Sequence, residues 1–152
     1  MKTLRKITID GFKSIEHAEL ELGDLNVVIG ANGSVKSNFI GVFRLLERVL
    51  SHNLQVYVGS EPDRLLHHGR KKTSALSLDF RFDQNAYGFA LKASQDTLIF
   101  ENERVEYSGL WNYAEPIAAG HKESKLEEAA ESYKNKIPKH VFPMVRNLVV
   151  YH

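Results

Sequence analysis

The stretch 25–37 reads LNVVIGANGSVKS, and it decides the fold that we expect. Its first five residues form a short run rich in β-branched side chains, which is typical of a buried parallel strand. A loop of small residues follows over 30–37, and apolar residues then recur at helical spacing as far as Leu50. A strand, a glycine-bearing loop and an amphipathic helix in this order predict a phosphate-binding P-loop.

The chemistry of such a loop depends on its backbone and on two side chains. Consecutive N–H groups from the loop and the first helical turn point at the phosphates, and the positive end of the helix dipole adds to them. Gly30, Lys36 and Ser37 have the spacing of G-x-x-x-x-G-K-[ST]. In that pattern the lysine reaches the β- and γ-phosphates, and the hydroxyl of the next residue holds Mg²⁺. We therefore expect ATP and Mg²⁺ as ligands.

One position of the pattern fails, because Val35 stands where glycine is required. Glycine allows a backbone conformation or a close approach to phosphate that a β-branched residue resists. Valine therefore either strains the loop, by about 1–3 kcal/mol, or moves the backbone away from the phosphates. A relaxed loop without a ligand is the alternative.

Composition limits the remaining possibilities. The chain has 152 residues, 43% of them apolar, a net charge of +1 and no cysteine. This predicts one ordinary domain or part of one, without disulfides or thiolate metal sites, and the charge argues neither for nor against nucleic acid. No apolar run approaches the ~20 residues that cross a bilayer, and no signal peptide is visible, so we expect a cytoplasmic protein without membrane contact.

Periodicity along the chain predicts a single partial domain. Alternating apolar residues indicate strands before the loop and again over 74–108, where turn signals separate them into an antiparallel meander. A stripe of Leu126, Ala130, Tyr133 and Ile137 predicts a helix over 121–137 that Pro138 stops. We assign strands, P-loop and helix to 1–50, a loop or insertion to 51–73 and the meander to 74–110. The last part, 111–152, is assigned a helical segment and, at 147–151, the start of a further strand.

Three segments near the N-terminus carry a resemblance to a known family. They are 7–15 (ITIDGFKSI), 20–34 (LELGDLNVVIGANGS) and 36–38 (KSN). They resemble the N-terminus of the SMC/RecF/OLD-type ATPases, which belong to the ATP-binding-cassette class and are often called AAA family ATPases. The resemblance is dense over 1–50 and architectural beyond it. It implies an α/β fold of the P-loop NTPase type: a cassette N-terminal lobe with a mixed sheet around the P-loop helix and an antiparallel β-subdomain, truncated before the second half.

The resemblance also implies residue roles and partners. Asn38 would lie near the α-phosphate, and Lys13 and Ser14 would lie at the edge of the nucleotide, near the base or the phosphates. DNA or a nuclease subunit would be a partner, in DNA-related or defence processes, and the full-length family dimerises through the ATPase head. The residues that would wrap the β- and γ-phosphates are Asn32, Gly33, Ser34, Lys36 and Ser37, within a loop that also contains Gly30 and Val35.

The motifs of the catalytic half are missing from these 152 residues. A Walker B strand needs four apolar residues and then Asp-Glu, whereas Leu76–Phe80 alternates, and 149–152 ends without an acid. Ser108-Gly109 precedes no expected helix, so it is no signature motif. Because hydrolysis needs an acid that positions water and metal, we expect no ATP turnover by this chain. A nucleotide-free pseudo-ATPase that acts as an assembly module remains the alternative, and a small-molecule kinase is disfavoured by the meander.

Three further features have ordinary structural explanations. We expect the basic stretch Arg64–Lys72 to be a solvated loop rather than a DNA contact. Adjacent His67 and His68 lack further ligands at a spacing that suits metal. Trp111 and Tyr113 are expected to be hydrophobic anchors rather than platforms for a base.

Overall fold

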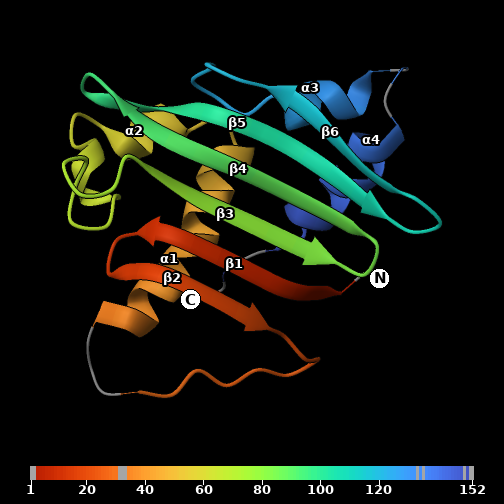
Figure 1. Cartoon of the computed structure of the whole chain (residues 1–152), viewed down its shortest axis with the longest axis horizontal. Helices are drawn as coiled ribbons and strands as arrows, with labels where there is room; N and C mark the ends of the chain where they lie inside the picture. The colour runs from red at the N-terminus through yellow and green to blue at the C-terminus, as the bar shows by residue number, and fades with distance from the viewer. Residues whose placement is uncertain (1–2, 31–33, 133, 135, 149, 151–152) are drawn as a thin grey trace.

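The computed structural model describes residues 3–30, 34–132, 134, 136–148 and 150, and its centre is a six-stranded open sheet (Figure 1). The strand order is β2-β1-β3-β4-β5-β6, and every pairing is antiparallel. The α/β class that the sequence predicts is therefore confirmed, with an antiparallel sheet. The strands are β1 Leu4–Phe12, β2 Ile15–Glu21, β3 Ala75–Phe82, β4 Asn85–Ser94, β5 Thr97–Ser108 and β6 Asn112–Ala118.

The helices cover one face of this sheet, and Figure 1 shows α1 and α4 behind it. The apolar side chains of β3 alternate inward, from Leu76 to Phe82, and pack with the buried stripe of α1. Burial of these side chains provides most of the stabilisation, at about 1.5–3 kcal/mol for each large one. The helical elements are α1 Ser34–Leu50, α2 Leu54–Val58, the 3₁₀ turn η1 Pro62–Arg64, α3 Leu126–Glu131 and α4 Lys136–Arg146.

The opposite face of the sheet is polar. Arg104 pairs with both Asp79 and Glu106, each at 2.9 Å, and Arg81 pairs with Glu106 at 2.7 Å. This alternation of apolar and charged side chains is what a sheet needs when one of its faces meets water. No helix within the described ranges is long and apolar enough to cross a membrane.

The meander predicted over 74–110 is present as β3, β4 and β5, and a further strand, β6, follows it. β6 escaped prediction because its sequence, NYAEPIA, is polar and contains Pro116. Proline cannot donate to a strand ladder and is tolerated at a sheet edge, which is where β6 lies. Trp111 and Tyr113, expected as anchors, are exposed at the β5–β6 hairpin, so that expectation is wrong.

The strand predicted at 25–30 is the main correction. Residues 26–30 belong to no strand, and Leu25, Val27 and Ile29 are 75–86% exposed. The sheet ends at β2, and the chain then turns where the Asn26 side chain exchanges two hydrogen bonds with the backbone of Gly23, at 2.8 and 2.9 Å. A buried strand needs neighbours to pair with, and none of the described residues supplies one. The expected mixed sheet is thus wrong for the described chain.

Three further segments differ from expectation. Residues 51–73 contain α2 and η1 rather than loop alone. The helix expected over 121–137 is limited to α3 at 126–131, and Pro138 lies in the first turn of α4 instead of ending a helix. The first turn tolerates proline because its N–H groups have no intrahelical partner. Asn147, Leu148 and Val150 lie in no strand, whereas Tyr133, Val149 and Tyr151 fall outside the described residues.

Candidate functional site

The turn between β1 and β2 carries the first two candidate residues, Lys13 and Ser14. Lys13 has a left-handed backbone with φ of 50°, which is costly for a residue with a side chain. Two contacts from the 62–67 segment hold Lys13 there. The Lys13 N–H donates to the Leu65 carbonyl at 2.9 Å, and His67 Nδ1 lies 2.8 Å from the Lys13 carbonyl oxygen. The turn is therefore fixed by parts of the chain about fifty residues away.

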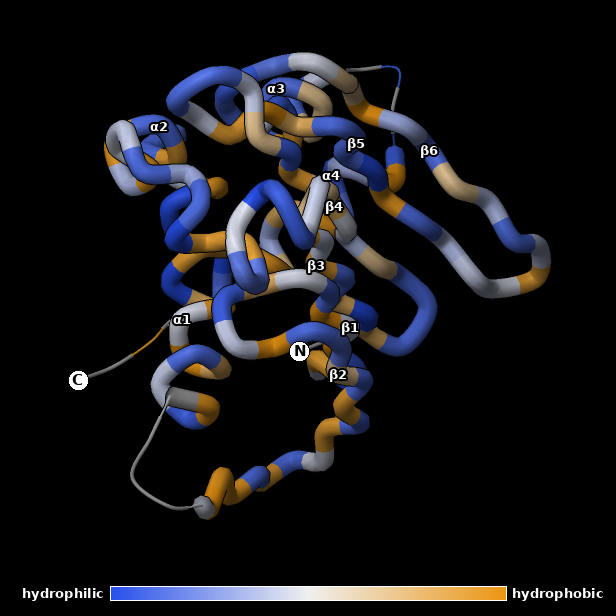
Figure 2. Tube along the Cα trace, turned by 60° about the vertical axis from the view of Figure 1, so that its left-hand side comes forward, coloured by the Kyte–Doolittle hydropathy of each residue, from blue (hydrophilic) through white to orange (hydrophobic). Residues whose placement is uncertain are grey.

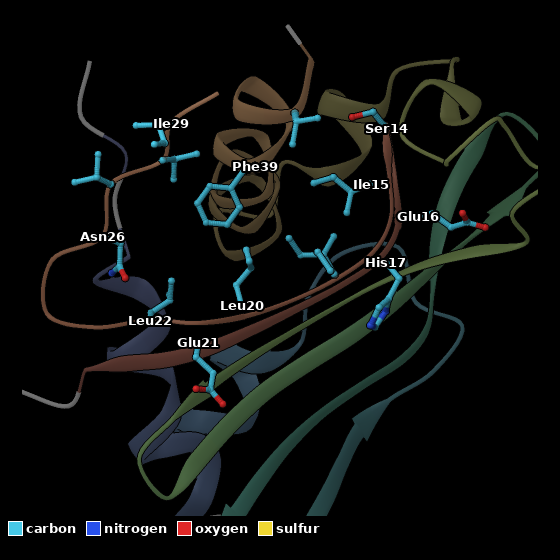
Figure 3. A pocket seen from close by; sticks show the side chains of 15 residues that line it. Ser14, Ile15, Glu16, His17, Leu20, Glu21, Leu22, Asn26, Ile29 and Phe39 are labelled. Carbon is cyan, nitrogen blue, oxygen red and sulfur yellow. The ribbon is translucent and has the colours of Figure 1, made fainter. Parts of the chain in front are cut away.

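A hydrogen bond joins this turn to the beginning of α1. The side-chain amide of Asn38 donates to the Ser14 hydroxyl at 2.6 Å. Two of the three segments that carry the family resemblance, 7–15 and 36–38, are thus brought together. Ser14 and Phe39 also line one common groove, which Figure 3 shows from close by.

Lys36 bridges the two ends of the candidate loop. Its Nζ donates to the carbonyl oxygen of Gly30 at 2.7 Å. The ammonium group therefore lies at the mouth of the loop, in the first turn of a 17-residue helix, where the helix dipole favours negative charge. Ser37 follows with an exposed side chain. The Asn32 and Gly33 positions of the predicted site lie outside the described residues, and so does the side chain of Ser34.

Val35 does not produce the backbone strain that the sequence suggests. α1 already begins at Ser34, so Val35 lies in the first helical turn, and it is not among the described non-glycine residues with positive φ. Its side chain is 64% exposed and faces the groove. Val35 itself is therefore unstrained, and its cost arises only if the backbone at this position must change to bind a ligand.

The electrostatics of the site favour an anion. The pKa of Lys13 is lowered, first by burial of its amine and then by the neighbouring positive charges of Arg64 and Arg44. Among the described residues, no carboxylate forms a salt bridge with Lys13 or Lys36. An ammonium group that forms no salt bridge with a carboxylate gains free energy when a phosphate group neutralises its charge.

One protein oxygen near the start of α1 is a candidate ligand for a magnesium ion that is bound together with a nucleotide. Mg²⁺ keeps several waters and takes one or two protein ligands together with the phosphates of the substrate. One exposed hydroxyl, that of Ser37, meets this need at the helix start. No cluster of three or more His, Cys, Asp or Glu that could hold an ion by itself occurs in the described part of the chain.

A second polar cluster, missed by the sequence reasoning, is fully buried under the sheet. Glu103 is 0% exposed and accepts hydrogen bonds from the Tyr87 hydroxyl at 2.7 Å and the Ser124 hydroxyl at 2.5 Å. His121 Nε2 lies 2.8 Å from its other oxygen, which also accepts from the Lys125 N–H at 2.9 Å. These bonds tie the segment before α3 to the sheet, and they satisfy the buried carboxylate.

The stretch Arg64–Lys72, expected to be a solvated loop, instead packs partly on the candidate site. His67 is buried against Lys13, while Arg70 pairs with Asp63 at 2.9 Å.

Comparisons of the chain with protein-family models, curated proteins and solved structures gave no match.

Proposed function

We propose that this chain binds the phosphates of Mg-ATP at the Gly30–Ser37 loop, as the nucleotide-binding lobe of an SMC/RecF/OLD-like P-loop ATPase. The observation that carries the proposal is the hydrogen bond between Asn38 and Ser14, because it joins two of the resembling segments at one place. The bridging position of Lys36 and the cationic surroundings of Lys13 support the same assignment.

The proposed roles follow from the chemistry of each group. Lys36 leaves the Gly30 carbonyl for the β- and γ-phosphates, which are stronger acceptors because they are charged. The N–H groups at the start of α1 donate to phosphate oxygens, and Ser37 provides a ligand for Mg²⁺. Lys13 and Ser14 approach the nucleotide from the β1–β2 turn. Asn32, Gly33 and Ser34 complete the phosphate loop.

Binding without turnover is the expected activity of these 152 residues. Phosphoryl transfer to water needs a group that orients the water and an acid that holds the metal, and the sequence has no such pair in motif form. Partnership with DNA, with a nuclease subunit or with a second ATPase head belongs to the same proposal and rests on the family resemblance alone.

A nucleotide-free assembly module is the second candidate. The helical backbone at Val35 and the exposed apolar residues at 25–29 favour it, because a helical valine does not supply the glycine conformation of a phosphate loop and an exposed apolar segment suits contact with another protein.

Titration of a fluorescent ATP analogue with Mg²⁺ separates the two candidates. The unaltered chain and the Lys139→Ala variant, which removes an exposed lysine on α4, should bind the analogue equally, and Lys36→Ala should weaken binding at least about tenfold, or ~1.4 kcal/mol. Equal binding by Lys36→Ala and Lys139→Ala would favour the assembly module.

A further inference from the structure

An apolar groove lies between β2, the start of α1 and the segment 25–29. Its volume is about 740 Å³. Figure 3 shows Leu20 and Leu22 on one wall, Phe39 on the helix side, and Ile29 on the opposite wall. Figure 2 shows the 25–29 segment as a largely hydrophobic stretch at the end of the molecule beyond β2. Exposed apolar surface of this size and continuity usually marks a binding surface.

Both backbones that border the groove have hydrogen-bonding groups to offer. β2 is the last strand of the sheet on this side, and within the described residues its outer edge has no strand partner. The segment 25–29 is rich in β-branched residues and has no backbone–backbone hydrogen bond with the described part of the chain. An extended peptide satisfies such an edge with a ladder of N–H and C=O contacts, which a compact apolar molecule cannot provide.

Charge at the rim selects the kind of peptide. Glu16 and Glu21 flank the groove with their carboxylates turned away from its apolar interior (Figure 3), and neither forms a salt bridge with a described residue. A second copy of this chain, paired edge to edge through β2, would bring the Glu16 and Glu21 carboxylates of both copies into one interface, where like charges repel. The same carboxylates attract a strand that has Lys or Arg at its ends.

We propose that this groove binds an extended strand of another protein, with apolar side chains alternating into the groove and basic residues at both ends. The strand adds to the outer edge of β2 and covers Val27 and Ile29. This inference goes beyond the nucleotide site and does not depend on it, so every measurement below is made without nucleotide.

The test uses three fluorescein-labelled peptides of defined sequence: KVTITVK, the acidic form EVTITVE and the proline form KVTPTVK. We expect saturable binding of KVTITVK, weaker binding of EVTITVE by roughly fivefold because two exposed ion pairs are lost, and no binding of KVTPTVK, because proline removes a ladder donor. Equal binding of KVTITVK and KVTPTVK, or no saturable binding of KVTITVK, would overturn the proposal.

Variants locate the site and exclude a second copy as the occupant. Ile29→Glu should weaken KVTITVK binding at least about tenfold, whereas Val56→Glu, at an equally exposed position on α2, should leave binding unchanged. Both residues are exposed, so folding is retained, and circular dichroism checks this. Light scattering without peptide should give the mass of one chain. A dimer that Ile29→Glu dissociates would assign the groove to a second copy and contradict the proposal.

Discussion

The side-chain amide of Asn38 donates a hydrogen bond to the hydroxyl of Ser14 across 2.6 Å, which ties the first turns of α1 to the β1–β2 turn. Twenty-four residues separate the two partners in sequence. The bond places the Ser14 end of the β1–β2 turn beside the second turn of α1, while the Lys13 ammonium group lies further along the helix, beside Gly41. In our account this region is a phosphate site.

Removing the Ser14 hydroxyl should weaken nucleotide binding more than it weakens the fold. Ser14→Ala removes one exposed hydrogen bond, which costs about 0.5–1.5 kcal/mol, so the melting temperature should fall by only a few degrees. Affinity for the Mg-ATP analogue should fall severalfold, because Ser14 and the second turn of α1 are no longer joined. Asn38→Ala should give the same loss, and the double variant should lose little more than either single one. Fully additive losses would contradict the coupling.

Val35→Gly should strengthen binding of Mg-nucleotide. Valine adopts the relaxed helical form in this structure, so its cost arises when the loop wraps phosphate. Relief of about 1–3 kcal/mol of strain in the bound loop corresponds to roughly 5- to 150-fold tighter binding. Without nucleotide the variant should be less stable, by a few tenths of a kcal/mol, because glycine is the poorer helix former. Titration of both chains, with Lys36→Ala as the blank, measures the effect. Equal affinities would mean that the loop tolerates valine.

ATP turnover by this chain should be absent. No acidic pair in motif form is available to hold metal and orient water, so bound ATP should remain intact. A coupled phosphate-release assay on the purified chain should match Lys36→Ala within error. Phosphate release well above that variant would show that a catalytic acid has been overlooked.

Because of the buried cluster around Glu103, the free energy of unfolding should fall as the pH rises into the alkaline range. The pKa of Tyr87 lies well above its ordinary value of 10.0, because burial and then the negative charge of Glu103 oppose ionisation. The unfolded tyrosine loses its proton near its ordinary pKa while the folded one keeps it. The contribution of Tyr87 is therefore fully present below about pH 10 and is lost above it, with a slope approaching ~1.4 kcal/mol per pH unit.

Urea unfolding between about pH 8 and pH 11 measures this slope. Tyr87→Phe should be less stable at pH 8, because the Glu103 carboxylate loses a donor, and should lack this part of the slope. Tyr113→Phe alters an exposed tyrosine and should keep the slope of the unaltered chain. A slope that survives in Tyr87→Phe would assign the effect to another group.

Local periodicity predicted much of the fold and only part of the site. The apolar spacing of α1 and the alternation of β3 to β5 are local signals, and the structure contains these elements. The run 25–29 has the composition of a strand, but composition does not say whether a neighbouring strand exists. Burial of Glu103 was invisible because an irregularity between Ala90 and Leu91 shifts the register of β5, so that Phe100 and Glu103 both face inward.

The contacts that hold Lys13 in place also could not be predicted. They come from Leu65 and His67, and the sequence gives no sign that this distant segment packs on the β1–β2 turn. The spacing of Gly30, Lys36 and Ser37 selected these residues as phosphate and Mg²⁺ ligands, and that role stays a prediction; the structure shows a contact between Lys36 and Gly30. The long-range contacts that position the candidate residues become visible only in the structure.

The most direct test of phosphate binding at this loop is a map of backbone amide chemical shifts on adding Mg-ATP to the ¹⁵N-labelled chain. Our account predicts that the largest shift changes fall on Gly30, on residues 34–38 and on the Lys13-Ser14 turn, and that they disappear in Lys36→Ala. No shift changes at saturating Mg-ATP, or the largest changes elsewhere, as at the exposed Trp111, would contradict it.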